Sequence, residues 1–406
     1  MARPYVKVTV TEKAERSARA GHPWVYGEEI TAVSGEYENG GLVDVYTKKD
    51  RFLGTGFIND RSKIRVRIIS RNANDKFDAA FWERRLRYAV DYRRTVMGKD
   101  FSACRLIFGE ADQFPGLTVD RFGNILVAQV LSLGIDRIKG QLFDTLVRIL
   151  RESGEQIDAV YERNDVKIRD LEGLEQYKGF YHADGLRDDL DGSVIITENG
   201  IKYNVDYING QKTGFFLDQK YNRAAVARIA EGRRVLDCFT HTGAFALNAA
   251  AAGAELVTAV DVSKEAVEMT RKNADLNGIK NMDFVCADVF DYLTAAEREN
   301  RRDWDLIILD PPAFTKSGAT VKNAVRGYKE INLKAMKLLP RGGYLATCSC
   351  SHFMRDELFR KMLADAAADA NVSLRQIEAR QQSPDHPILW NVNETDYLKF
   401  YIFQVV

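Results

Sequence analysis

From about Arg223 onward, short apolar runs alternate with helical stretches, and this alternation constrains the fold more than any other feature of the chain. The expected strands are RRVLDCF, LVTAVDVS, MDFVCAD, WDLIILDPP and GGYLATCSC. Intervening segments such as KEAVEMTRKNADLNG have the pattern of helices. Alternation of this kind produces a parallel sheet with helices on both faces, and ligands bind beyond the carboxyl ends of its strands. The sequence therefore predicts an α/β fold with a doubly wound, Rossmann-like sheet.

An aspartate stands at the end of four successive expected strands, namely Asp237, Asp261, Asp288 and Asp310. The turn after the first strand, DCFTHTGAF, has one glycine at the helix entry, Gly243, and lacks the G-x-G-x-x-G pattern of a pyrophosphate site. An acidic turn would repel phosphate, so it favours a cationic or zwitterionic cofactor. Asp261 is placed where a carboxylate can bind both hydroxyls of a ribose.

The first 72 residues consist of short β-like runs with glycine-rich turns and predict a small β-barrel or sheet. This segment holds 13 Lys and Arg against 9 Asp and Glu, a net charge of +4 in a chain whose total is zero. Alternate basic residues in RSKIRVRIISR would form one face of a strand: Arg61, Lys63, Arg65 and Arg67. Two interpretations stay open, a solvated outer face and a row that contacts RNA phosphates.

Between these regions the sequence predicts a charged helix in DAAFWERRLRYAVDYRRTVM, then α+β structure to about residue 190. Residues 191–208 read as a β-hairpin that turns at Asn199-Gly200. We therefore expect three domains: a β-rich domain at 1–72, a central α+β domain at 73–190, and the doubly wound domain at 191–406.

Composition excludes several classes of protein. No apolar run approaches the roughly 20 residues of a membrane span, and MARPYVKVTV lacks the apolar core of a signal peptide. Five cysteines, an odd number without the spacing of a small secreted domain, favour a reducing compartment. We expect a cytoplasmic protein without a membrane partner.

The motifs VLDCFTHTGAFALNAA, VTAVDVS, VCADVFDYL and LIILDPPAFTKS resemble, in this order, those of class I S-adenosylmethionine-dependent methyltransferases. Together with NGQKTGFFLDQ and CSCSHFM, nearly the whole chain resembles the bacterial 23S rRNA 5-methylcytosine methyltransferase family. That resemblance implies an N-terminal PUA RNA-binding domain, with matching patterns in GHPWVYGEEI and SKIRVRII. It also implies rRNA as partner, with a single-stranded or looped target, and leaves a homodimer open.

The same resemblance implies a binding site for S-adenosylmethionine. Asp261 would hold the ribose, Asp288 the adenine amino group, and the turn from Asp237 to Gly243 the methionine part. A loop in GQKTGFF would close over the cofactor through Thr213 and Phe215. Core packing is the alternative for Phe215 and Phe216, and close helix–strand packing is a second, compatible role for Gly243.

Carbon 5 of cytosine is a poor nucleophile, and a thiolate that adds to carbon 6 makes it electron-rich. Cys350, in the S-C-S of CSCSHFM, would be this nucleophile, and Asp310 would act as an acid near N3. Cys348 has the same strand parity but lies about 6–7 Å further back, so we expect it in the core. Many related enzymes have a second cysteine after the prolines, where this chain has Ala313.

Alternatives remain for these residues and for the function. A zinc site of Cys348, Cys350 and His352 lacks the usual spacing, and His241 and His352 are equally compatible with structural roles. The chain is also compatible with a methyltransferase that acts on guanine or an exocyclic amine without a nucleophile. A third hypothesis is a non-catalytic RNA-binding factor in ribosome assembly that retains a cofactor pocket.

Overall fold

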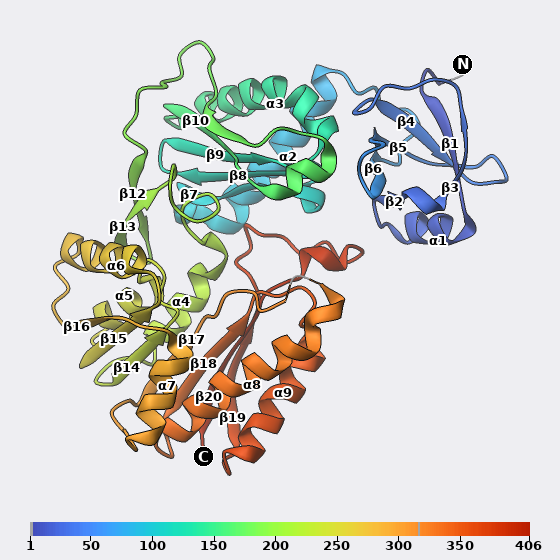
Figure 1. Ribbon diagram of the computed structural model, residues 1–406. Helices are drawn as coiled ribbons and strands as arrows, with labels where there is room; N and C mark the ends of the chain where they lie inside the picture. Colours follow the sequence, from blue (N-terminus) through green and yellow to red (C-terminus); the bar gives the residue numbers. More distant parts are fainter. Residues whose placement is uncertain (1–2, 316) are drawn as a thin grey trace. The chain divides into compact units, whose positions relative to one another are not determined.

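The computed structural model describes residues 3–315 and 317–406 (Figure 1). Its internal contacts divide the chain into two compact units, each assembled from several segments. Unit 1 comprises 1–196, 205–215 and 384–395, and unit 2 comprises 197–204, 216–383 and 396–406. The domain boundaries expected from the sequence, at residues 72 and 190, stay a prediction.

Unit 1 begins with the β-rich structure expected for the first 72 residues. Its described strands form one six-stranded sheet in the order β2-β6-β5-β4-β1-β3. Val8, Val43 and Val66 of this sheet are completely buried and lie in its core. The elements are β1 (Val6–Val10), α1 (Glu12–Ala20), β2 (Trp24–Tyr26), β3 (Ile30–Ser34), β4 (Leu42–Tyr46), β5 (Phe52–Ile58) and β6 (Ile64–Ser70).

The second part of unit 1 is the expected α+β region. The described strands form a sheet in the order β11-β10-β9-β8-β7, and two long helices accompany it. The elements are α2 (Ala79–Met97), β7 (Ala103–Phe108), β8 (Leu117–Phe122), β9 (Ile125–Val130), α3 (Leu133–Glu152), β10 (Ala159–Asn164) and β11 (Tyr177–Phe180). Phe57 of β5 stacks on Trp82 of α2, with ring centroids 6.1 Å apart.

The basic row expected in RSKIRVRIISR is only partly a surface feature. Arg67 is 13% exposed, and its guanidinium lies 2.8 Å from Glu172 and 3.5 Å from Glu110. Arg65 pairs with Asp60, whereas Arg61 and Lys63 are exposed. Arg61 and Lys63 lie before β6, and two carboxylates of unit 1 engage Arg67, so these side chains do not form one continuous basic row along the strand.

The hairpin expected at 191–208 is present as β12 (Ser193–Glu198) and β13 (Ile201–Asp206). Asn199 has φ 54° and Gly200 has φ 82°, the left-handed pair that a tight hairpin turn requires. Within unit 2, Glu198 at the tip pairs at 2.6 Å with Arg223 of α4 (Lys220–Ala227), and both side chains are buried.

Unit 2 contains the doubly wound sheet. Its described strands have the order β16-β15-β14-β17-β18-β20-β19, in which the first five are parallel and β20 is antiparallel to both neighbours. The α/β prediction is confirmed. The strands are β14 (Arg234–Cys238), β15 (Leu256–Asp261), β16 (Met282–Cys286), β17 (Leu306–Leu309), β18 (Tyr344–Ser349), β19 (Leu374–Arg380) and β20 (Lys399–Val405).

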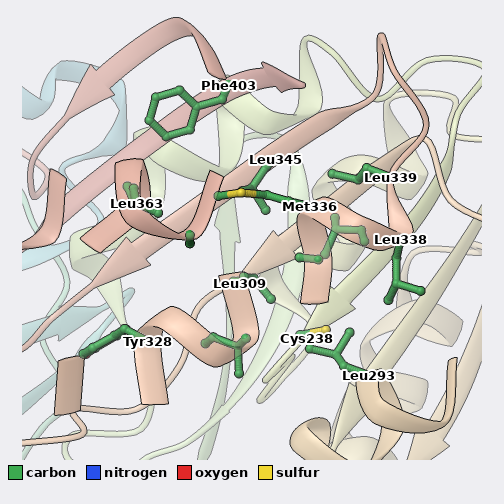
Figure 2. Close-up of a cluster of buried hydrophobic side chains, with 14 of the residues drawn as sticks. Cys238, Leu293, Leu309, Tyr328, Met336, Leu338, Leu339, Leu345, Leu363 and Phe403 are labelled. Atoms are coloured by element: carbon green, nitrogen blue, oxygen red, sulfur yellow. The ribbon is translucent and has the colours of Figure 1, made fainter. Parts of the chain in front are cut away.

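The helices of unit 2 cover this sheet on both faces (Figure 1). On one face lie α7 (Val289–Arg298), α8 (Val321–Leu338) and α9 (Asp356–Asp369), and with the other face pack α4, α5 (Ala244–Ala251) and α6 (Lys264–Leu276). Figure 2 shows the core of the first face, where Cys238, Leu309 and Leu345 of the strands meet Tyr328 and Met336 of α8. No helix in the described residues is long and apolar enough to cross a membrane.

Candidate active site

The carboxyl edge of the parallel strands in unit 2 brings three of the predicted aspartates together. Asp237 is in register with Ala259 of β15 and Ile308 of β17, and Asp261 is the last residue of β15. Asp310 follows β17 directly. The negative charges of Asp310 and Asp261 both act on Asp237. Three of the four aspartates expected at the carboxyl edge of the sheet therefore lie near one another in the structure.

Asp237 carries an unused acceptor in a buried position. Its Oδ2 accepts hydrogen bonds from the Thr240 hydroxyl at 2.6 Å and the Ala246 amide at 3.0 Å. Its Oδ1 is buried and has no hydrogen-bond partner. Burial raises the pKa of Asp237 to about 7, and Asp310 and Asp261 add to this rise. Because a buried, unpaired carboxylate oxygen is costly, the site suits a ligand with a positive charge.

Asp261 is held in a fixed orientation by backbone amides. His241 donates to its Oδ2 and Ser263 to its Oδ1, both at 2.9 Å. Each oxygen keeps a further lone pair for a hydroxyl donor. The half-buried carboxylate is thus fixed in orientation, while its contact with a ribose stays a prediction.

Asp288 and Gly243 have structural roles beside their predicted ones. Asp288 is the N-cap of α7, and its Oδ1 accepts from the amides of Phe290 at 2.8 Å and Asp291 at 3.2 Å. Gly243 precedes α5 with φ 82°, and a Cβ there would lie 2.4 Å from Cγ2 of Thr270 on α6. Gly243 therefore allows close packing, here against helix α6 where helix–strand packing was expected, while its contact with a cofactor stays a prediction.

Thr213 and Phe215 belong to unit 1. The Thr213 hydroxyl donates to Asp120 at 2.6 Å, and both Thr213 and Phe215 are buried. In unit 2 the following residue, Phe216, packs edge-on against His241, with ring centroids 5.0 Å apart. Phe216 therefore contacts the turn between β14 and α5, a position that the core-packing interpretation did not reveal.

Cys348 lies inside the sheet beside Asp310. The residue is 1% exposed, and its sulfur lies 3.0 Å from Oδ1 of Asp310. The Gln219 side-chain amide donates to the same Asp310 oxygen at 3.1 Å and to the Cys348 sulfur at 3.4 Å. Burial and the nearby carboxylate raise the pKa of Cys348 well above its usual range, and burial raises the pKa of Asp310. Cys348 is therefore a protonated core thiol, as expected.

Cys350 has a different environment one residue beyond β18. Its side chain is half-buried, and its sulfur lies 4.0 Å from the carbonyl of Pro311 in the D-P-P loop. Both neighbouring serines are anchored to Tyr328 of α8, since the Tyr328 hydroxyl lies 3.0 Å from the hydroxyls of Ser349 and Ser351. The backbone that carries Cys350 is thereby held at the carboxyl edge.

Lys399 is a residue near this thiol that sequence reasoning missed. The ammonium group of Lys399 donates to the carbonyls of Ser351 and Tyr397, both at 2.8 Å. Burial lowers the pKa of Lys399 to about 8, and the nearby Cys350 opposes this shift. Register places Lys399 opposite Ser349, but only the pairing of β18 with β20, 50 residues apart in sequence, reveals it.

The strand order, the acidic carboxyl edge and the unpaired oxygen of Asp237 fit the class of S-adenosylmethionine-dependent methyltransferases. A family model with that description matches residues 136–404, and a model for a PUA-like domain matches residues 8–71. The chain belongs to the family of Ribosomal RNA large subunit methyltransferase I.

Two relatives illustrate the relationship. The Ribosomal RNA large subunit methyltransferase I of Pseudoalteromonas atlantica is 40% identical over 403 residues, 98% of this chain and 99% of the relative. That of Escherichia coli O139:H28 is 37% identical over 405 residues, 99% and 100% of the two chains.

Solved structures share the fold at lower identity. A SAM-dependent methyltransferase-type protein from Streptococcus mutans has a TM-score of 0.81 at 23% identity and covers 98% of this chain and 100% of that chain. A second structure of the methyltransferase class, complexed with SAH, has a TM-score of 0.83 at 22% identity, with coverages of 98% and 100%.

Proposed function

We propose that this protein methylates carbon 5 of a cytosine in large-subunit rRNA through a covalent adduct with Cys350. The family's name supports an rRNA substrate, and the PUA-like domain is consistent with it. The choice of chemistry is supported by three groups at the ends of β17 and β18. They are the half-buried thiol of Cys350, the carboxyl group of Asp310 with its raised pKa, and the buried ammonium of Lys399.

We assign the cofactor roles to the acidic edge. Asp237 would bind the ammonium of the methionine part, Asp261 the ribose hydroxyls and Asp288 the adenine amino group. The cofactor supplies an electrophilic methyl group when bound. The unpartnered Oδ1 of Asp237 supports this assignment, because an ammonium would satisfy it.

In the proposed reaction the Cys350 thiolate adds to carbon 6 of cytosine, and Asp310 gives a proton to N3. The bond between the Cys350 sulfur and carbon 6 makes carbon 5 electron-rich. Carbon 5 can then accept the methyl group. Water then takes the proton of carbon 5, the C–S bond breaks to release the Cys350 thiolate, and N3 returns its proton to Asp310, which leaves 5-methylcytosine. Lys399 favours the thiolate form of Cys350 by its charge.

The test uses unmodified 23S rRNA and labelled S-adenosylmethionine, followed by nucleoside mass analysis. We expect 5-methylcytidine from the parent and from Cys348→Ala, and none from Cys350→Ala, which should bind the cofactor normally. RNA with 5-fluorocytosine at the target should form a covalent adduct that survives a denaturing gel. An adduct with Cys350→Ala but not with Cys348→Ala would reverse the assignment. Methylation by both variants would favour an amine or guanine substrate.

A further inference from the structure

Helix α2 of unit 1 presents two tyrosines and one arginine along an exposed stripe, with the half-buried Arg85 next to it. Arg84, Tyr88 and Tyr92 follow one another at four-residue spacing, and Arg85 lies beside them. Tyr88 is 65% exposed and Tyr92 38%. We call these four residues the tyrosine–arginine face. The remaining apolar side of α2 is buried, so this face is not part of the core that fixes the helix.

The tyrosine–arginine face borders a hollow. A cavity of about 430 Å³ lies between these four residues, the segment from Ala111 to Gln113, and Pro387. Ligand sites of roughly 300–1,000 Å³ are common in proteins, so this hollow has room for a nucleotide. Its walls combine aromatic rings with guanidinium groups, the combination that binds single-stranded nucleic acid.

One cation of this hollow, Arg85, forms no ion pair in the described residues, although the charge of Asp75 acts on it. Arg85 donates to the carbonyl of Gln113 at 3.1 Å and lies 4.4 Å from the ring centre of Phe81. Burial lowers the pKa of Arg85 to about 10, so the group is still cationic at neutral pH.

Both carboxylates of the hollow are already engaged. Asp112 accepts two hydrogen bonds from Arg93, at 2.5 and 2.7 Å. Asp75 accepts from the Ser70 hydroxyl at 2.6 Å and lies 3.6 Å from Arg84. An anion in the hollow would therefore meet the charge of Arg85 without displacing a neighbouring carboxylate.

We propose that the tyrosine–arginine face binds an unstacked base and an adjacent phosphate of single-stranded RNA. Tyr88 supplies the stacking surface and Arg85 the phosphate contact. This inference rests on the proposed RNA substrate. It adds an RNA contact in unit 1, whereas the aspartates assigned to the cofactor lie in unit 2. Tyrosine and arginine are also enriched at protein interfaces, so the test below includes a protein partner as an outcome.

The test compares variants of the full-length protein by fluorescence anisotropy with a short labelled single-stranded RNA of mixed sequence. Tyr88→Ala should weaken binding about 5- to 150-fold, the range for loss of one stacked base, while Tyr88→Phe should bind like the parent. Arg85→Gln should reduce the slope of log affinity against log salt by about 0.7, the contribution of one phosphate on a single strand. Arg341→Ala, an exposed arginine on the turn before β18, is the charge-matched control.

Mapping of ultraviolet crosslinks gives a second readout, in which we expect an RNA-linked peptide that contains Tyr88. Affinity for S-adenosylmethionine and the thermal midpoint should be unchanged in Tyr88→Ala, because this side chain is largely exposed. With 23S rRNA as substrate, KM should rise and kcat stay constant.

Unchanged RNA affinity in Tyr88→Ala and Arg85→Gln would overturn the inference, even if the parent forms 5-methylcytidine. Weaker binding only to ribosomal particles, with normal binding to free RNA, would also overturn it and indicate a protein partner. If the parent forms no 5-methylcytidine but the two variants bind RNA more weakly than the parent, the tyrosine–arginine face is an RNA-binding site and the proposed chemistry is wrong.

Discussion

At the scale of single residues, the site is defined by polar groups whose surroundings differ sharply over short distances. Cys348 and Cys350 share a strand parity, yet one is a buried thiol next to Asp310 and the other is half-buried beside Pro311. Asp237 and Asp261 both stand at strand ends, but only Asp237 has an oxygen without a partner. Two residues of the same type therefore differ in their expected roles because their side chains differ in solvent exposure and in hydrogen-bond partners.

Asp237 should couple cofactor binding to pH. Its pKa in the cofactor-free protein is raised to about 7, and a bound ammonium would favour the ionised form. Binding should therefore release a proton below pH 7, and affinity for S-adenosylmethionine should rise with pH and level off above about 7. Calorimetry in two buffers of different ionisation enthalpy measures the proton release.

Asp237→Asn is the control for this linkage and should show no proton release. The same raised pKa implies that the cofactor-free protein loses stability as pH rises from the unfolded value, near 3.9, through about 7. Equal apparent binding enthalpies for the parent in both buffers would remove Asp237 from the ammonium site.

Lys399 should set the reactivity of Cys350. Lys399→Met keeps most of the side-chain volume but removes the ammonium that binds the carbonyl of Ser351. We expect the rate of Cys350 alkylation at neutral pH to fall about 3- to 10-fold, because the thiolate loses a nearby positive charge. Peptide mass analysis after iodoacetamide treatment gives this rate, with the exposed Cys286 as internal reference.

Lys337→Met is the matched control, since Lys337 of α8 pairs with Glu297 at 2.7 Å on the surface. An alkylation rate that is identical in Lys399→Met and Lys337→Met would show that Lys399 only supports the backbone of this loop.

At the scale of elements, the site depends on how closely helices approach the ends of the strands. Gly243 allows α6 to pack against the turn that begins α5, and Tyr328 of α8 holds both serines around Cys350. Asp288 caps α7, so a predicted cofactor residue also fixes the start of a helix. The residues that position the expected binding site at the carboxyl edge therefore also stabilise the helices next to it.

Gly243→Ala should lower the free energy of unfolding of unit 2 by more than the cost of placing an alanine at a left-handed φ. A left-handed φ costs an alanine about 1–2 kcal/mol, and the clash with Thr270 adds to this cost. Gly232→Ala isolates the first contribution, because Gly232 has φ 67° and nothing within 4 Å of its Cβ position. Urea unfolding compares the two.

Replacement of Thr270 by alanine should restore part of the stability of Gly243→Ala, since it removes Cγ2. Equal destabilisation by Gly243→Ala and Gly232→Ala would mean that α6 moves aside at little cost, contrary to the close packing described above.

At the scale of the whole molecule, segments distant in sequence complete each unit. The residues 384–395 belong to unit 1, and the tip of the hairpin, 197–204, belongs to unit 2. Arg67 of the N-terminal sheet pairs with Glu172, more than 100 residues later in the chain. Arg93 of α2 likewise donates to the carbonyl of Asp385 at 3.0 Å. Such long-range polar contacts join the parts of unit 1.

Arg67→Ala should therefore act on stability and not chiefly on RNA binding. Glu172 is 3% exposed, and the nearby Arg67 counteracts the effect of burial to keep its pKa low. Loss of one partner of a buried ion pair costs about 3–5 kcal/mol. Urea unfolding should show this loss, whereas Lys63→Ala, at an exposed position, should be near neutral.

A lowered pKa for Glu172 implies that this contribution is present above about pH 4.5 and is lost as pH falls through the folded value. The difference between Arg67→Ala and the parent should therefore shrink in acid. If Arg67→Ala instead unfolds like Lys63→Ala but binds RNA more weakly, the phosphate-contact interpretation of this arginine is restored.

The sequence by itself determined the parallel sheet, the acidic carboxyl edge and the hairpin turn at Asn199-Gly200, because apolar periodicity and turn preferences are local properties of the chain. It also placed Cys350 beyond Cys348 along one strand, since side-chain parity follows from strand geometry. Only the tertiary structure decided that Lys399 and Gln219 lie beside these thiols, and that Arg67 is paired with Glu172. These neighbours come from segments 48 or more residues away, and their approach depends on how sheets and helices pack, which no local pattern encodes.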